Sequence, residues 1–420
     1  MGGLVHRYGG DGVGQRILSF GTSTLVALLT PLVVLPVIAN VTDASGWAAL
    51  AVGQSIGILF GIVVAFGWPV VGPVELARSS REAVGAIFYE SLLTRGLLLL
   101  AVIAPVAAVS YVAAPPGRFG LVLATAAAFA STALTSSWVA VGLGTASRFM
   151  LLESLPRLVV LGVAAVAIQA GGSLYLYPVA VAAASVIGAS MFAWSGVRPR
   201  RPRDPLLTAV RRRLRAHVAA AASALSAAAY SAGALLLVGI STTVHQTALM
   251  SSAQVIYSVG LYVVVALSSS LQAWVVHPDP AVARERRTRA LLWHGALGLV
   301  GMVVYASSAP AIATILFGAD LAPGHAVAIA YGVAFGAVSV VTSLAQHFLL
   351  PASDVLGVLV ATAVGALVGV PALILLAHEF GAAGGASALA ASELVVLVAM
   401  AVRVRQVTRA RHPEPGYALS

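Results

Sequence analysis

The chain is dominated by long apolar segments that only short polar stretches interrupt. A helix that crosses the hydrocarbon core of a membrane needs about 20 mostly apolar residues. Segments of about this length are residues 17–40, 47–72, 92–113, 119–143, 155–170, 175–196, 217–241, 248–275, 290–311, 325–349, 355–377 and 384–403. Only 9% of the residues are charged, whereas soluble proteins average about 25%. The sequence therefore predicts an all-α polytopic membrane protein of twelve spans, because runs this long and continuous favour helices over the alternating strands of a barrel.

An arginine-rich stretch divides the apolar segments into two sets of six. Residues 197–215 hold eight arginines and a single acid, Asp204. A run this basic is excluded from hydrocarbon, and beside membrane spans it marks the cytoplasmic side. We therefore expect an N-terminal six-helix bundle (1–196), a cytoplasmic linker (197–215), a C-terminal six-helix bundle (216–404) and a cytoplasmic tail (405–420). We expect the linker to act as a tether and not as a binding site.

The other basic residues orient the spans. The 24 basic residues are all arginines, and nearly all lie at the two termini, in the linker and in the loops after even-numbered spans. The opposite loops carry only Arg118, and Arg95 falls in the first turn of the expected third span, from where it can snorkel to the cytoplasmic surface. This bias predicts a multi-pass protein of the plasma membrane with both termini in the cytoplasm. The net charge of +10 then reflects topology and contact with anionic lipid, and not nucleic acid.

The two halves show weak internal similarity. When the sequence is shifted so that Trp68 aligns with Trp274, Arg78 also aligns with Arg284. Six spans in each half is an even number, so the halves have the same orientation in the membrane. The sequence therefore predicts two parallel bundles of six helices.

The sequence contains no arrangement of residues that is typical of an enzyme. It has no cysteine and no lysine, and its nine histidines are scattered without the spacing of a metal site. We therefore expect neither catalysis nor a bound metal or cofactor.

Polar residues inside the spans are candidate substrate contacts, because each is costly in hydrocarbon. Glu393 is the only acid in the middle of an expected span. The other candidates are glutamines and tyrosines: Gln54, Tyr230, Gln254, Tyr257 and Gln272. Each of them also fits a hydrogen bond or a packing contact between helices, and both interpretations stay open.

Several loose motifs occur in an order and spacing that resemble one transporter family. They are PLVVLPVIA at 31–39, GWAALAVGQSIG at 46–57, SSWVAVGLG at 136–144, LPRLVVLGV at 155–163, APAIATILFGADL at 309–321 and EFGAAGGASALAASEL at 379–394. The chain resembles the Wzx-like polysaccharide flippases of the multidrug/oligosaccharidyl-lipid/polysaccharide exporter (MOP) superfamily, over nearly its whole length. The resemblance implies a MATE/Wzx-like fold in a bacterial cytoplasmic membrane, with a central cavity lined by the first, second, seventh and eighth spans.

The same resemblance implies a function and partners. Such a protein moves a polyprenyl-pyrophosphate-linked oligosaccharide between leaflets by alternating access, in the service of polysaccharide biosynthesis. Its partners are membrane lipid and, in the same pathway, a polysaccharide polymerase and glycosyltransferases. The expected cavity helices carry almost no charge, although a pyrophosphate favours arginine. The nearest candidates are Arg16, Arg95 and Arg157, each at the cytoplasmic start of a span.

Three alternatives stay open. A cation-coupled multidrug or small-molecule antiporter shares the fold, but the first span lacks the internal acid that such antiporters typically carry. A membrane enzyme acting on polyprenyl-linked sugars and a structural membrane subunit are the other two. The expected number of spans is too low for the chain to look like the fourteen-helix lipid II flippases.

Overall fold

The computed structural model describes residues 30–31, 33–143, 150–195, 200–201, 205–272, 274–275, 277–352 and 354–411. In these residues all regular structure is helical. Helices of the N-terminal half are α2 (Ala44–Ala65), α3 (Trp68–Arg78), α4 (Arg81–Ala101), α5 (Ile103–Ala113), α6 (Phe119–Ser131), η1 (Thr132–Leu134), α7 (Ser137–Gly142), η2 (Met150–Ser154), α9 (Leu155–Gln169) and α10 (Leu176–Ser195). Those of the C-terminal half are α11 (Leu206–Tyr230), α12 (Ala234–Ser241), α13 (Val244–Gln272), α14 (Pro280–Phe317), η3 (Ala319–Leu321), α15 (His325–Ser343), η4 (Leu344–Leu349) and α16 (Val355–Arg411).

Nine helices of the described residues are long and apolar enough to cross a membrane, or ten if α11 and α12, which meet at 42°, form one bent span. The expected first span lies mostly outside the described residues. The expected eleventh and twelfth spans both lie in α16, which breaks at Gly381 (φ +60°). Past this break, the Ser392 hydroxyl donates to the Gly365 carbonyl (2.8 Å), so the two parts of α16 run antiparallel. The count of twelve spans stays a prediction.

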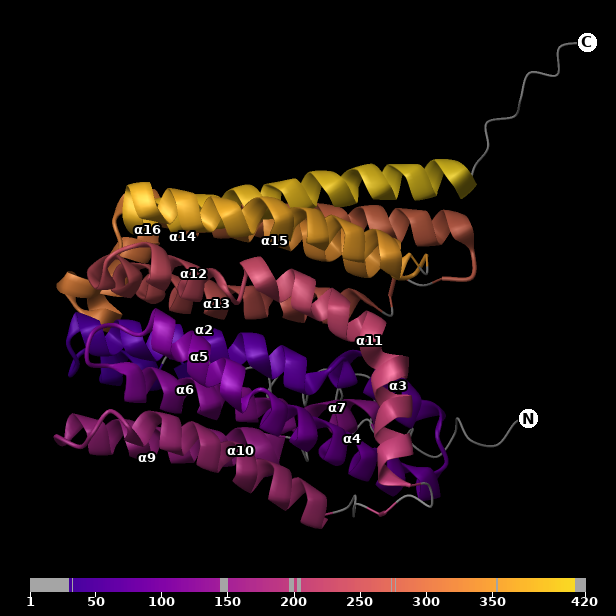
Figure 1. Cartoon of the computed structure of the whole chain (residues 1–420). Helices are drawn as coiled ribbons and strands as arrows, with labels where there is room; N and C mark the ends of the chain where they lie inside the picture. Colours follow the sequence, from indigo (N-terminus) through magenta and orange to yellow (C-terminus); the bar gives the residue numbers. More distant parts are fainter. Residues whose placement is uncertain are drawn as a thin grey trace, which may run out of the picture.

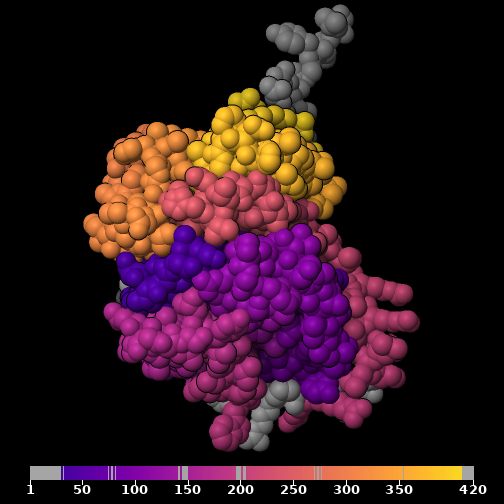
Figure 2. Space-filling view, turned by 60° about the vertical axis from the view of Figure 1, so that its left-hand side comes forward, coloured from indigo at the N-terminus to yellow at the C-terminus, as the bar shows by residue number. Residues whose placement is uncertain are grey.

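The two halves pack side by side, each around its own core. One hydrophobic core is built mainly from residues of the N-terminal half, and a second lies wholly within the C-terminal half. In Figure 1 the N-terminal half, indigo to magenta, lies below the C-terminal half, orange to yellow. Figure 2 shows the surfaces of the two halves in contact, with the rose segment around α12 between them. Trp47 of α2 joins the halves, because its indole nitrogen donates to the Ser252 hydroxyl (3.2 Å) and its ring packs on Phe317 (5.6 Å between centroids).

Local sequence explains where α2 begins and ends and how closely it packs on α6. The Asp43 side chain caps its first turn by accepting from the Gly46 amide (2.8 Å). The helix ends where Phe66 and Gly67 adopt left-handed backbone angles. Inside it, a Cβ atom at Gly57 would lie 2.5 Å from the Ala126 carbonyl oxygen of α6. Glycine is required there because the two backbones touch, which is the usual role of glycine ridges in membrane helices.

Two expected boundaries were wrong. Helix α4 begins at Arg81 rather than near residue 92, so Arg95 lies deep inside a helix and not in its first turn. The same extension places Glu90 inside a candidate span, so Glu393 is not the only acid within one. Helix α11 begins at Leu206, so the second half of the expected linker, including Arg212 and Arg213, is helical.

Loops that the sequence predicts on the same side of the membrane lie at the same end of the structure. At one end, which we call the arginine-rich end, Arg403 forms two hydrogen bonds with Asp354 (2.7 and 3.1 Å). At the other, Arg118 pairs with Asp43 (2.8 Å) across the loops before α6 and α2. Helices α3, α11 and the end of α16 all lie toward the right of Figure 1. Which end faces the cytoplasm stays a prediction.

Candidate functional site

A cavity of about 360 Å³ lies mainly inside the N-terminal half. Its walls come from residues near the start of the described chain, from α2, the α6–η1 region, η2, α9 and α10, with one residue from α13 across the interface. The lining residues are Thr30, Pro31, Val34, Leu35, Gln54, Ile58, Phe129, Thr132, Thr135, Glu153, Ser154, Arg157, Leu161, Tyr177, Val181 and Tyr262. The resemblance implied a cavity lined by the first, second, seventh and eighth spans. No residue of the expected seventh span lines this cavity, and residues of the fourth, fifth and sixth do.

One wall of the cavity is a break in helical structure. Helix α6 ends in the short 3-10 turn η1, and Thr135 is extended (φ −47°, ψ 146°) before α7 begins. A break at membrane depth leaves backbone carbonyls that need donors. Arg95 supplies them, because one terminal nitrogen donates to the carbonyls of Ala133 (2.7 Å) and Thr135 (2.8 Å). The interaction explains why the sequence tolerates both a helix break and an arginine at this depth.

The prediction that Arg95 snorkels to the surface is therefore wrong. Its side chain is only 1% exposed, and the guanidinium carbon lies 5.8 Å from the ring centroid of Trp138. The second terminal nitrogen has no hydrogen-bond partner among the described residues. Arg95 thus lies directly behind the cavity wall that Thr135 forms.

Glu153 faces the same break from η2. Its carboxylate accepts a hydrogen bond from the Thr135 hydroxyl and one from the Ser136 amide (3.2 Å). Arg157 follows one turn later on the same helical face, and both residues line the cavity. The charges of Arg157 and Arg95 both act on this carboxylate. Buried Glu153 and Arg95, together with half-buried Arg157, form a charged cluster, which we call the Glu153 cluster.

Glu153 was not among the predicted site residues, because it was expected in a loop after the fourth span. One available signal was the spacing of Glu153 and Arg157, which are four residues apart at the start of an apolar helix. Of the predicted substrate contacts, Gln54 and Arg157 line the cavity. Arg16 lies outside the described residues, and so does the side chain of Gln272 at the end of α13.

The remaining predicted residues lie in the C-terminal half, apart from the cavity. The Tyr331 hydroxyl donates to the Gln254 side-chain oxygen (2.8 Å). The ring of Tyr257 packs on Tyr331 (5.1 Å between centroids). Tyr230 and Glu393 are also buried there, at 4% and 5% exposure. The structure therefore brings the predicted residues into two separate groups, one in each half.

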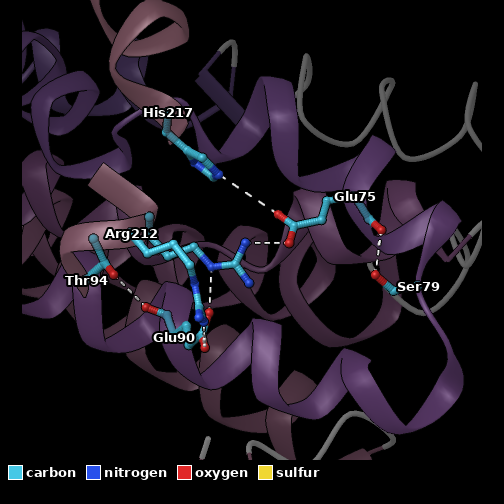
Figure 3. A network of polar contacts seen from close by, with 7 residues as sticks. Glu75, Ser79, Glu90, Thr94, Arg212 and His217 are labelled. Carbon is cyan, nitrogen blue, oxygen red and sulfur yellow. Dashed lines mark hydrogen bonds and ion pairs between the residues drawn. The ribbon is translucent and has the colours of Figure 1, made fainter. Parts of the chain in front are cut away.

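A network of ion pairs joins the two halves at the arginine-rich end (Figure 3). Arg213 of α11 bonds to Glu75 of α3 and, through its Nε atom, to Glu90 of α4 (2.5 Å). Arg212 binds the other oxygen of Glu90 (3.0 Å), and His217 lies 3.9 Å from Glu75. We call these five residues the Arg213 network.

The Arg213–Glu90 pair at the centre of the network is shielded from solvent. The Glu90 side chain is 4% exposed and that of Arg213 is 13% exposed. The Arg213 guanidinium also lies 5.5 Å from the ring centroid of Trp68, whose ring meets the edge of His217. Arginines of the stretch 197–215 therefore bind the N-terminal half, a role beyond that of a tether. That this stretch is not a binding site for substrate stays a prediction.

Comparisons with known proteins place the fold. No protein-family model matches the sequence, and no curated relative matches it. Among solved structures, the lipid II flippase MurJ in an inward closed conformation has a TM-score of 0.73 at 10% identity, over 93% of this chain and 87% of that one. An inward-facing multidrug resistance MATE family transporter of the MOP superfamily has a TM-score of 0.61 at 13% identity, over 94% and 99% of the two chains. A MOP superfamily transporter from Pyrococcus furiosus has a TM-score of 0.54 at 14% identity, over 94% and 96%.

The chain has the fold of these membrane transporters. The expected span count argued against a likeness to lipid II flippases, yet the match covers most of both chains. A shared helical arrangement therefore extends to MurJ as well as to the MATE proteins. At these identities the comparisons establish the fold and not the substrate.

Proposed function

We propose that the protein is a MOP-type transporter that flips a polyprenyl-pyrophosphate-linked oligosaccharide across the bacterial cytoplasmic membrane by alternating access. The observation that carries the proposal is the Glu153 cluster in the wall of a cavity beside the interface of the halves. A fold shared with MurJ, whose name gives a lipid-linked substrate, supports the substrate class.

Arg157 is the cation proposed to meet the pyrophosphate. It is the only basic side chain among the described residues that line the cavity. A guanidinium binds two oxygens at once, which suits a phosphate better than the point charge of an ammonium. A negative head group competes with Glu153 for Arg157, and Arg95 lies behind the same wall. Tyr262 reaches the cavity from the C-terminal half, so movement between the halves alters the site.

The cavity is too small for the whole proposed substrate. Its volume of about 360 Å³ is near the low end of the roughly 300–1,000 Å³ of pockets for drug-sized ligands. It accommodates a head group but not an oligosaccharide, so the halves have to separate during transport. The Arg213 network holds them together at the arginine-rich end, and the Trp47 contacts hold them toward the other. In the proposed cycle these two sets of contacts break in alternation.

A cation-coupled multidrug antiporter is the second candidate. Glu153 favours it, because a buried carboxylate in a cavity lined by aromatic rings suits an organic cation. For the flippase, a polysaccharide polymerase and glycosyltransferases are the proposed partners in the same pathway. The two candidates make different predictions for substitutions in the Glu153 cluster.

The experiment is flipping of a fluorescent polyprenyl-pyrophosphate-linked oligosaccharide in proteoliposomes. We expect Arg157→Lys to lower the rate at least about tenfold, because charge is kept while the bidentate fork is lost. Arg118→Lys is the matched control, since Arg118 pairs with Asp43 and neither residue lines the cavity. An unchanged rate in Arg157→Lys contradicts recognition of the head group by Arg157. Efflux of an organic cation that Glu153→Gln abolishes, without any flipping, favours the antiporter.

A further inference from the structure

Two histidines lie buried against each other in the C-terminal half, apart from the cavity. His294 of α14 and His347 of η4 are both 0% exposed, and their ring centroids are 5.5 Å apart. The helices around them pack tightly, since a Cβ atom at Gly298 would lie 3.0 Å from the Gly336 carbonyl oxygen. An ionisable side chain inside a membrane helix is costly and calls for a functional explanation.

Most polar atoms of this pair have no partner. The Ser339 hydroxyl donates to the His294 backbone carbonyl (2.7 Å) and lies 3.4 Å from its Nδ1 atom. Among the described residues, no partner exists for Nε2 of His294, for either ring nitrogen of His347 or for the Ser343 hydroxyl. Ser339, Ser343 and His347 follow at intervals of four residues, which places them along one side of α15 and η4. Buried unsatisfied groups are rare, and a cluster of them indicates a ligand.

The backbone at His347 is also unusual. Residues Leu344–Leu349 form a π-helical turn that follows α15 directly. Such turns are rare, and they occur frequently at functional sites. Two independent observations therefore indicate a functional site at the histidine pair. One is the set of buried side-chain atoms without partners, and the other is the irregular turn that carries His347.

The surroundings favour a proton over a metal ion. The helices packed against the pair carry several titratable groups, among them Arg287 and Tyr305 on α14, Tyr257 and Tyr262 on α13, Tyr331 on α15, and Glu393 and Arg403 on α16. In the described part of the chain, neither histidine forms an ion pair, and no group of three histidine, cysteine or acidic side chains is arranged to hold a metal. A divalent ion between two neutral imidazoles would be an uncompensated buried charge of two. A single proton adds half of that charge, and two imidazolium rings this close would repel each other.

A further cavity lies at the arginine-rich end, beside the π-helical turn that carries His347. This cavity of about 440 Å³ is lined by Arg287, Phe348 and Leu349, among others. Arg287 lies two turns before His294 on α14, and Phe348 follows His347 directly. The cavity therefore reaches the residue that follows His347 in the chain.

We propose that His294 and His347 form a site that binds one proton. One imidazole takes the proton from water at an unpartnered ring nitrogen, and the resulting imidazolium donates to the neutral ring opposite. The two rings have to approach for this hydrogen bond, which draws the π-helical turn toward α14. That this proton drives transport rests on the proposed function, whereas the site itself does not.

The experiment follows the ring ¹⁵N resonances of the full-length protein, labelled at its nine histidines, in nanodiscs between pH 4 and pH 8. His294→Gln and His347→Gln assign the two signals, and His325→Gln, at the exposed start of α15, is the control. We expect the ¹⁵N resonances of both rings to shift in one common titration step, because strongly coupled sites titrate as a pair. When one histidine is replaced, the titration midpoint of the other ring should move by about one pH unit. The control leaves both signals unchanged.

Three results overturn the proposal. The first is that both rings stay neutral throughout the titration, and the second is that they titrate independently of each other. The third is that Zn²⁺ at constant pH shifts both signals, which would identify a metal site. None of these readouts needs a transported substrate, so a failure of the proposed function leaves the test intact. In proteoliposomes, His294→Gln combined with His347→Gln should abolish the acceleration of flipping by a pH gradient, and an acceleration equal to that of the parental protein would contradict coupling through this site.

Discussion

Removal of Arg213 tests whether the Arg213 network closes the arginine-rich end. Arg213→Gln leaves two carboxylates without their shared cation, and one of them, Glu90, is only 4% exposed. Breaking a buried ion pair by removing one partner typically costs about 3–5 kcal/mol. Arg212 still binds Glu90 from a position that is 51% exposed. We therefore expect the low end of that range, about 3 kcal/mol, which shifts the closed-to-open ratio on the order of 100-fold.

The assay uses pulsed electron paramagnetic resonance to measure the distance between two spin labels, one next to α3 and one on α11. The chain contains no cysteine, so Ser80→Cys and Leu207→Cys provide the only two sites for spin labels. Both residues are exposed, and they lie next to α3 and near the start of α11. We expect one short distance in the parental protein and a second, longer distance that dominates after Arg213→Gln.

The control removes an ion pair that solvent screens. Arg289 pairs with Glu285 inside α14, with both side chains more than half exposed. Exposed pairs contribute about 0–1 kcal/mol, so Arg289→Gln should leave the distance distribution unchanged. If the folded Arg213→Gln protein keeps the parental distribution, the network stabilises the fold but does not close the arginine-rich end.

Two further predictions concern pH and topology. Hydrogen bonds from Arg403 hold the pKa of the Asp354 carboxyl below its usual value, so the pair stabilises the fold above the ordinary aspartate pKa of about 3.9 and loses this effect as pH falls through the folded value. Asp354→Asn should therefore lower the melting temperature at pH 7, and the difference should close below about pH 4; a constant difference at all pH values would contradict a titrating pair. In intact cells, Ser45→Cys should react with an impermeant thiol reagent and Ser80→Cys should not, and the reverse pattern would invert the predicted orientation.

The sequence predicted helices well where hydropathy alone decides their bounds. The segment expected at 175–196 is α10, Leu176–Ser195, and the segment expected at 325–349 is α15 with η4. The start of α4 was misplaced because the charged residues Glu82 and Glu90 interrupt residues 81–91, and the expected span was begun after them, although Glu82–Ala101 as a whole is apolar enough to cross a membrane. The start of α11 was misplaced for the same reason, since arginine is a good helix former outside the membrane.

The charged part of the candidate site depends on tertiary contacts that hydropathy cannot show. An arginine near the start of a span is expected to reach outward, whereas Arg95 is buried because the Ala133 and Thr135 carbonyls need a donor. That need arises from a helix break that no proline marks, within the sequence STALTSSW at 131–138. The Arg213 network likewise depends on how α11 lies across α3 and α4. The sequence shows the charged residues themselves but does not show which groups they contact.

Transport of a lipid-linked sugar across a bilayer tests the central claim most directly. Purified protein is reconstituted into liposomes with a fluorescent polyprenyl-pyrophosphate-linked oligosaccharide in both leaflets, and a membrane-impermeant quencher reports the outer fraction over time. The proposed function predicts complete quenching in protein-containing vesicles, with a rate that falls at least about tenfold in Arg157→Lys. If only the fluorescent lipid of the outer leaflet is quenched in protein-containing vesicles, as in protein-free vesicles, the result contradicts the proposal that the protein is a flippase.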